Sequence, residues 1–255
     1  MFSQDANLFD ARSLGLSGSN VACSDPWSGI NNPAGLGLHS SLDISINYNN
    51  RFLLSELSTQ TIISTIPTVL GNISPSFSYY GGHQYNEIHM VFAFGKLLAK
   101  WLSAGINFGY YMQTIEATNK RASALTGQIG IIAIPHKGLK IGINIINPTG
   151  SAYGGFKGEE IASGLQAGIS ISEEQNYGLA AQINYSEFEI FHYSMGAEYF
   201  LAEYLSICAG LKFPASLSFS FGLGMEFQRL SIDFGFEQHS ILGLSSAFSM
   251  GYKIK

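Results

Sequence analysis

The residue types that most often carry catalysis or bind metals are few in this sequence, and they are scattered. The six histidines fall in different segments, without the close spacing of metal ligands, at positions His39, His83, His89, His136, His192 and His239. No Gly-x-Ser-x-Gly elbow, phosphate-binding loop or His-Glu-x-x-His helix occurs. A Ser/His/acid set drawn from separate strands stays open as an alternative, because serine is too abundant for any one to stand out. The sequence therefore predicts a protein without enzymatic activity, metal ion or cofactor.

The composition argues against both a soluble protein and a bundle of membrane-spanning helices. Charged residues make up only 12% of the 255-residue chain, while aromatic residues reach 13%, and so few charges cover a water-exposed surface poorly. The most apolar stretch, residues 130–146, is interrupted by Pro135, His136 and Lys137, so it is no candidate for a spanning helix. A net charge of -5, with no basic cluster larger than Lys120-Arg121, argues against nucleic acid as a partner.

From Leu42 onward, apolar residues alternate with small or polar residues. The run at residues 102–110 places Leu, Ala, Ile, Phe and Tyr on one parity, and Ser, Gly and Asn on the other. Strict alternation is typical of strands with two different faces, as in a soluble β-sandwich or a membrane barrel. The polar parity holds mostly Ser, Gly and Asn, which suit a crowded lumen, and the unbroken apolar parity suits lipid. The pattern therefore favours an all-β fold, a transmembrane antiparallel β-barrel.

About fourteen such segments can be counted, and an even number is what single-chain bacterial barrels have. They begin near residues 41, 57, 72, 86, 101, 123, 138, 160, 177, 191, 204, 216, 229 and 243. Connections after odd-numbered segments, such as Asn147–Glu159, are longer than those after even-numbered segments, such as Pro67–Gly71. This asymmetry predicts that both termini are periplasmic. We therefore expect a barrel over residues 41–255 in the bacterial outer membrane, in contact with lipid and lipopolysaccharide, behind a separate segment at residues 1–40.

The N-terminal segment does not alternate, and it carries a resemblance to a known family. The stretches Ala11–Gly18, Asp25–Ile30 and Asn32–Leu36 resemble the FadL superfamily of outer-membrane barrels. Within that superfamily they look most like the PorV/PorQ branch, which is associated with the type IX secretion system of Bacteroidota. The resemblance implies a fourteen-stranded barrel whose N-terminal segment enters the lumen as a hatch.

The resemblance makes this hatch the candidate site, with its motif at Asp10, Arg12, Asp25, Pro26, Asn32, Pro33, Ala34 and Gly35. Charges buried in a lumen should pair with one another or with groups on the barrel wall, for which the candidates are Glu198, Lys212, Glu226, Asp233 and Lys253. We expect the hatch charges to pin the segment rather than to bind a ligand. Cys208 is expected to face the lumen, where a disulfide bond to Cys23 is conceivable, and two free thiols are the alternative.

Three functions fit this interpretation. The PorV/PorQ-like hatch and the short loops favour a non-enzymatic component of a larger outer-membrane protein complex, linked to type IX secretion. The alternative is a FadL-like passive channel for hydrophobic or small amphipathic molecules. It predicts an apolar pocket beside the hatch, or a lateral opening where a strand kinks, with Pro75 and Gly95 as the candidate kinks. A third function, a structural barrel with a sealed lumen, cannot be separated from the first by sequence.

Overall fold

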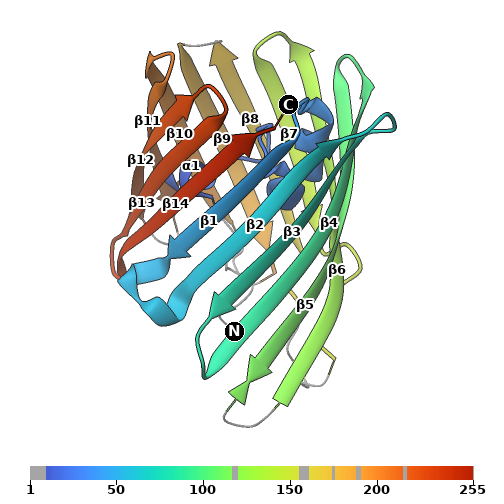
Figure 1. Cartoon of the computed structure of the whole chain (residues 1–255), viewed down its shortest axis with the longest axis vertical. Helices are drawn as coiled ribbons and strands as arrows, with labels where there is room; N and C mark the ends of the chain where they lie inside the picture. The colour runs from blue at the N-terminus through green and yellow to red at the C-terminus, as the bar shows by residue number, and fades with distance from the viewer. Residues whose placement is uncertain are drawn as a thin grey trace.

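A closed antiparallel barrel forms the body of the molecule. The computed structural model describes residues 10–116, 120–154, 161–173, 176–187, 191–214 and 217–254, and within them fourteen strands follow one another around the ring until β14 pairs with β1 (Figure 1). The strands are β1 (Asp43–Asn50), β2 (Ser58–Pro67), β3 (Asn72–Gly81), β4 (Tyr85–Ala99), β5 (Leu102–Ile115), β6 (Lys120–His136), β7 (Leu139–Ile146), β8 (Gly164–Glu173), β9 (Tyr177–Ser186), β10 (His192–Ala202), β11 (Leu205–Phe213), β12 (Ser218–Phe227), β13 (Leu230–His239) and β14 (Gly243–Lys253).

The fold class and strand number predicted from alternation are confirmed. The largest difference between a predicted and an observed strand start is at β8, which was expected near residue 160 and begins at Gly164. Two short connecting helices, η2 (Arg51–Leu53) and η3 (Ser55–Leu57), lie in the loop between β1 and β2. No helix in the described part of the chain is both long and apolar enough to cross a bilayer.

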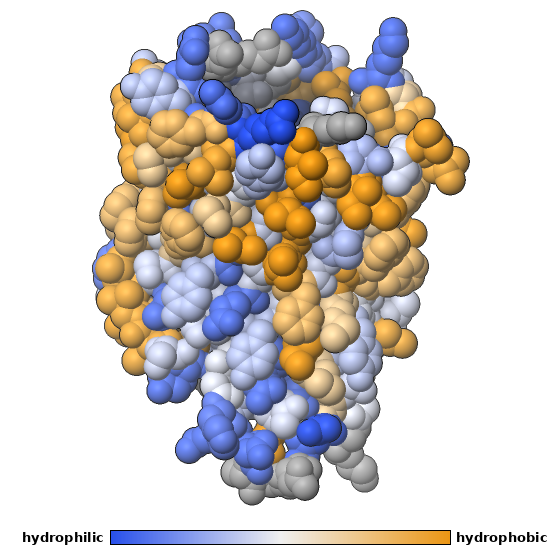
Figure 2. Space-filling model, in the orientation of Figure 1, coloured by the Kyte–Doolittle hydropathy of each residue, from blue (hydrophilic) through white to orange (hydrophobic). Residues whose placement is uncertain are grey.

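The two faces of the wall differ in chemistry, as the alternation requires. On β1, Ser45 and Asn47 face inward and are buried, while Ile44 and Ile46 face outward and are exposed. Exposed Leu, Ile, Phe and Tyr side chains occupy the outward positions of the other strands as well. Figure 2 shows hydrophobic side chains over much of the wall, with hydrophilic ones gathered toward the two ends. A closed barrel with an apolar outer wall is the structure of a membrane-spanning barrel.

The two ends of the barrel are built differently. The connections after even-numbered strands are tight turns, such as Lys137–Gly138 between β6 and β7, and they share one end with the C-terminal end of β14 (Figure 1). The connections after odd-numbered strands lie at the other end, and the connection between β7 and β8 is the longest. These ends are named here the short-turn end and the long-loop end. Strands β4, β5 and β6, of 15, 14 and 17 residues, extend the wall on one side of the long-loop end.

The described N-terminal segment, residues 10–38, lies inside the ring and is named here the hatch. It contains α1 (Ala11–Gly15), α2 (Ser28–Asn31) and η1 (Pro33–Leu38) (Figure 1). Helix α1 contacts β11 to β14, whereas η1 contacts β3 to β6, so the hatch crosses the lumen from one wall to the other. The Ser24-Asp25-Pro26 sequence resembles a helix start, but α2 begins only at Ser28. Asp25 instead accepts a hydrogen bond from the Trp27 amide, in a turn that precedes the helix.

Candidate functional site

Glycines on the barrel wall let the hatch backbone approach closely. A Cβ atom on Gly235 would overlap the carbonyl oxygen of Ala11, and one on Gly142 would overlap that of Val21. On β5 and β6, Gly105 and Gly130 lie against Pro33 and Asn32 in the same way. The small residues of the lumen-facing parity therefore form the seat of the hatch, because a larger side chain at these positions would displace it.

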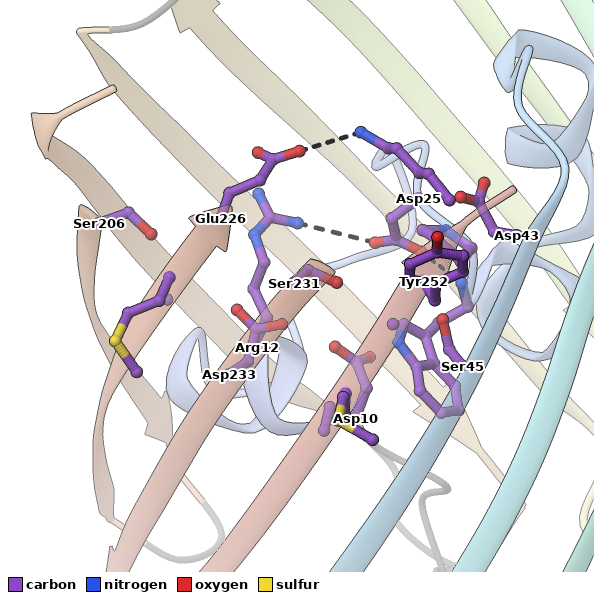
Figure 3. A pocket seen from close by; sticks show the side chains of 18 of the residues that line it. Asp10, Arg12, Asp25, Asp43, Ser45, Ser206, Glu226, Ser231, Asp233 and Tyr252 are labelled. Carbon is purple, nitrogen blue, oxygen red and sulfur yellow. Dashed lines mark hydrogen bonds and ion pairs between the residues drawn. The ribbon is translucent and has the colours of Figure 1, made fainter. Parts of the chain in front are cut away.

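Arg12 joins the hatch to the barrel wall through charge. Its Nη2 lies 2.6 Å from Oε2 of Glu198 on β10, and its Nε donates to Oε1 of the same carboxylate at 3.1 Å. The Nη1 atom lies 3.7 Å from Oδ2 of Asp25, so the guanidinium also links α1 to the turn before α2 (Figure 3). The side chain of Glu198 is only 6% exposed. A two-point hydrogen bond between a guanidinium and a nearly buried carboxylate fixes both position and orientation.

The other candidate partners of the hatch charges are not used. Glu226 and Lys253 pair with each other at the rim, with Nζ 2.9 Å from Oε1 (Figure 3). Among the described residues, neither Asp233 nor Lys212 forms an ion pair with the hatch. Of the alternative partners that the sequence offered, Glu198 is therefore the one that Arg12 contacts.

Asp10 is buried and caps helix α1. Its carboxylate accepts hydrogen bonds from the backbone amide, at 3.1 Å, and from the hydroxyl of Ser13, as a good N-cap does. Burial, reinforced by the negative charge of Asp25, raises the pKa of Asp10 to about 6 despite these hydrogen bonds. The hatch therefore holds one carboxyl group that changes charge just below neutral pH.

The remaining motif residues anchor the hatch through their polar atoms. The Asn32 side chain donates to the carbonyl of Val21 at 2.6 Å and accepts from the Ala34 amide at 3.1 Å, and Pro33 opens η1 directly after it. Ser103 of β5 donates to the Ala34 carbonyl, next to Gly35. Thr65 of β2 donates to the Pro26 carbonyl at 3.3 Å. Every residue of the motif thus lies in or beside a contact that holds the hatch in shape or in place.

A cavity of about 300 Å³ opens beside the hatch at the short-turn end. Figure 3 shows Asp10, Arg12 and Asp25 on the hatch and Asp233 on β13 around it. Its lining is rich in carboxylates, at Asp10, Asp25, Asp43, Glu198, Glu203, Glu226 and Asp233, and holds fewer cations, at Arg12, Arg229 and Lys253. We name it the acidic vestibule. It shows that the lumen on this side of the hatch is partly open.

The hydrogen-bond ladder between β2 and β3 is interrupted at one place. The ladder runs from Thr59 opposite Tyr80 to Ile63 opposite Ser76 and resumes at Ile66 opposite Ile73, so two pairs are missing without a change of register. The missing pairs lie at Ser64–Thr65 and Ser74–Pro75, whereas the ladder between β3 and β4 is continuous there. Because proline has no N–H group, Pro75 cannot donate to β2, which accounts for the interruption.

Hatch side chains pack against this interruption from inside the barrel. Trp27 and Ile30 form an apolar cluster with Ile63 of β2, and α2 contacts both β3 and β4. The hydroxyl oxygen of Ser74 is buried here without a hydrogen-bond partner. Of the two candidate kinks, Pro75 thus lies at the interruption of a ladder. Gly95 does not, because its pairing with Gly105 is intact and its missing side chain makes room for Pro33 and Leu36 of the hatch.

The two cysteines are free thiols in the structure. Cys208 faces the lumen, as expected, and its sulfur lies close to Gly15 and Gly222, where it fills the space below α1. The Cys23 sulfur lies 3.9 Å from the Ser19 carbonyl instead. Burial raises the pKa of the Cys23 thiol to about 11, so it is protonated and slow to react while the hatch is docked.

One Ser/His/Asp cluster, which sequence reasoning missed, occurs where η1 joins β1. Ser41, His39 and Asp43 lie within hydrogen-bond distance of one another, with the Ser41 hydroxyl 3.1 Å from Nε2 of His39. Both Ser41 and Asp43 meet the same ring nitrogen, however, whereas a catalytic triad requires the acid and the serine on opposite nitrogens. The i, i+2, i+4 spacing of these three residues was the sequence signal that could have revealed the cluster. In the structure, the cluster ties the hatch to the first strand.

The closed ring of fourteen antiparallel strands, the apolar outer wall and the crossing hatch define a membrane β-barrel with a FadL-type fold. No protein-family model matches the sequence, and no curated protein matches it. Among solved structures, the chain is similar to the toluene transporter TbuX of Ralstonia pickettii, with a TM-score of 0.71 and 11% identity over 97% of this chain and 98% of that chain. It is also similar to the P. putida toluene transporter TodX, with a TM-score of 0.73 and 10% identity over 96% of this chain and 98% of that chain. A third similar structure is a Pseudomonas aeruginosa FadL homologue, with a TM-score of 0.70 and 11% identity over 96% of this chain and 98% of that chain. At this identity, the likeness is one of fold.

Proposed function

We propose that this protein is a passive, non-enzymatic channel of the bacterial outer membrane for hydrophobic or small amphipathic molecules. The observation that carries the proposal is the interruption of the β2–β3 ladder at Pro75, backed by the apolar Trp27–Ile30–Ile63 cluster. The likeness in fold to toluene transporters supports the same substrate class. In the proposed orientation, the short-turn end, where β14 ends, faces the periplasm.

A lateral exit follows from this arrangement. Opening a barrel wall in lipid normally leaves backbone groups without hydrogen bonds, which is costly. Between β2 and β3 two pairs are already missing, and Pro75 has no N–H group to leave unsatisfied. A molecule that reaches the hatch from the long-loop end would displace Trp27 and Ile30 and pass between β2 and β3 into the membrane.

The proposal is tested by replacing Pro75 with valine, which restores the missing donor. One additional ladder hydrogen bond contributes about 1 kcal/mol, so the flux of toluene into vesicles containing the barrel should fall about fivefold. Pro67→Val is the matched control, since Pro67 pairs with Asn72 at the end of β2, where the ladder is intact. Equal flux through wild-type and Pro75→Val barrels would remove the lateral exit, and no flux above empty vesicles would remove the channel.

Membership of a larger outer-membrane complex, linked to type IX secretion, stays a prediction. The likeness to toluene transporters supports the channel better than this assembly role. Mild detergent extraction of native membranes tests it, because a stable component co-purifies with its larger partner, whereas a lone channel does not.

A further inference from the structure

Lysines without acidic neighbours in sequence gather on one side of the short-turn end. The turns β2–β3, β4–β5 and β6–β7, with the strand ends beside them, comprise residues 66–73, 94–103 and 132–138. These residues include no aspartate or glutamate, and their lysines are Lys96, Lys100 and Lys137. The three turns that follow around the ring each have a glutamate in or beside them, at Glu173, Glu203 and Glu226. The three turns without acidic residues are named here the basic rim.

Exposed apolar side chains share the basic rim with the lysines. Val69 and Leu70 form the tip of the β2–β3 turn, where Val69 is fully exposed and Leu70 is 69% exposed. The turn packs so closely on β4 that a Cβ atom on Gly71 would overlap the ring of Phe94. Figure 1 shows this turn projecting sideways from the barrel, and Figure 2 shows hydrophobic side chains where it projects. The tip is therefore an apolar projection beside the wall.

The β4–β5 turn adds further exposed apolar side chains next to this tip. The ladder between β4 and β5 has a bulge between Leu97 and Ala99, and a bulge changes the direction in which nearby side chains point. Leu97, Leu98 and Trp101 are all exposed there. The Trp101 carbonyl accepts a hydrogen bond from the Ile134 amide of β6 at 2.7 Å, which joins this turn to the end of the next strand. The basic rim is thus one continuous surface.

A lipid leaflet matches both the apolar and the charged part of this surface. The apolar tip continues the lipid-facing wall, since Ile66 and Ile73 share the outward parity of the exposed Ile62 and Phe77. Lysine side chains at the edge of an apolar surface extend their ammonium groups to the level of the headgroups, and tryptophan prefers the same interface. Cations that lack neighbouring carboxylates attract anionic headgroups. The charge of the basic rim therefore favours anionic over zwitterionic lipid.

We propose that the basic rim binds anionic phospholipids of the membrane leaflet at the short-turn end. The phosphate groups lie at Lys96, Lys100 and Lys137, and the acyl chains lie against the Val69–Leu70 tip. In the proposed orientation of the barrel, this is the periplasmic leaflet. The inference goes beyond the proposed channel and does not depend on it, because the basic rim lies on the outside of the barrel. Bound lipid holds the turn of the strand pair whose ladder is interrupted.

The fluorescence of Trp101 tests the preference for anionic headgroups. Trp27→Phe leaves Trp101 as the only tryptophan of the chain. The barrel is placed in vesicles that contain brominated phosphatidylglycerol or brominated phosphatidylethanolamine at the same mole fraction, and bromine quenches tryptophan on contact. The relative binding constant should favour phosphatidylglycerol about tenfold. Replacing the three lysines of the basic rim with glutamine should remove the preference.

A matched triple variant controls for the loss of charge alone. Arg51→Gln with Lys120→Gln and Arg121→Gln removes the same number of cations from the long-loop end and should keep the preference. High salt should weaken the preference in the wild type, because it screens exposed charges. Equal quenching of wild-type Trp101 by the two brominated lipids would overturn the assignment to anionic phospholipid.

A bimane probe tests where the apolar tip lies. Val69→Cys and Glu203→Cys place the probe in two turns of the same end, in a background that carries Cys23→Ser and Cys208→Ala. Spin-labelled lipid should quench the probe at position 69, and aqueous iodide should quench the probe at position 203. Quenching by iodide at both positions would place the tip in water and overturn the proposal. Protection of position 69 from both quenchers would also overturn it, and would identify a protein or a second copy as the occupant.

Discussion

At the scale of single residues, Arg12 joins the hatch to the barrel wall through its ion pair with Glu198. Replacing it with glutamine would leave the nearly buried Glu198 carboxylate without its partner. Loss of one member of a buried ion pair costs about 3–5 kcal/mol, and the partial exposure of Arg12 reduces this to about 2–3 kcal/mol. We expect faster maleimide labelling of Cys23, because release of the hatch exposes that thiol and lowers its raised pKa.

Two further variants separate charge loss from general damage. Arg12→Gln combined with Glu198→Gln should label more slowly than Arg12→Gln alone, since no unpaired charge is then left in the lumen. Arg229→Gln, in the same vestibule but outside the Arg12 contacts, should label like the wild type. Unchanged labelling of Arg12→Gln would show that the ion pair is not what keeps the hatch in place.

Asp10 gives the hatch a dependence on pH. Its pKa is raised from 3.8 to about 6, so the docked hatch favours the protonated form. Docking is therefore strongest below about pH 4 and weakens as the pH rises to about 6, by at most about 3 kcal/mol. Asn caps helices as well as Asp and cannot ionise, so Asp10→Asn should be docked more tightly than the wild type at pH 7.

The effect is measured at each pH as the ratio of the Cys23 labelling rate of the wild type to that of Asp10→Asn. The intrinsic reactivity of the thiol cancels in this ratio. The wild type should label faster than Asp10→Asn above pH 6, and the two rates should converge toward pH 4. A ratio that stays constant from pH 4 to pH 8 would mean that Asp10 does not change charge in this range.

At the scale of elements, the hatch and the wall fit through missing side chains. A methyl group at Gly235 would overlap the Ala11 carbonyl, whereas one at Gly82 meets nothing closer than ordinary contact distance. Gly235→Ala should therefore destabilise the docked barrel by about 1–3 kcal/mol, as overpacking does, and Gly82→Ala should be nearly neutral. Thermal unfolding monitored by heat-modifiable gel migration compares the two. Similar transition temperatures would show that the hatch can shift without cost.

The strands were predictable from sequence because a two-residue period marks each face of a strand directly. Leu102 to Tyr110 shows this most clearly, and its strand begins at Leu102 in the structure. The partner of Arg12 was predictable only as one of a set. Glu198 is 186 residues away in sequence, and its height in the lumen depends on the stagger of all the intervening strands.

Other parts of the site were beyond sequence reasoning for local reasons. Pro75 and Gly95 are both unfavourable in strand interiors, and only the observed ladder shows that the first interrupts pairing while the second admits the hatch. A sequence places such residues on a face, but it does not give their height along the barrel.

At the scale of the whole molecule, the central claim is that molecules leave a plugged barrel sideways between β2 and β3. The most direct measurement is toluene flux into vesicles through a barrel whose β2–β3 seam can be locked. Ser64→Cys with Pro75→Cys places two thiols directly opposite each other at the interruption, at the spacing of about 4.5–5.5 Å that suits a disulfide bond. Cys23→Ser and Cys208→Ala remove the native thiols from the background.

Ile62→Cys with Phe77→Cys is the matched pair in the intact part of the same ladder. Because Pro75→Cys also restores the missing donor, the reduced Ser64–Pro75 pair should conduct like the Pro75→Val barrel. Oxidation of this pair should abolish most of that remaining flux, and reduction should restore it, whereas oxidation of the control pair should have little effect. A barrel that conducts equally well with its Ser64–Pro75 seam locked and unlocked would contradict the account.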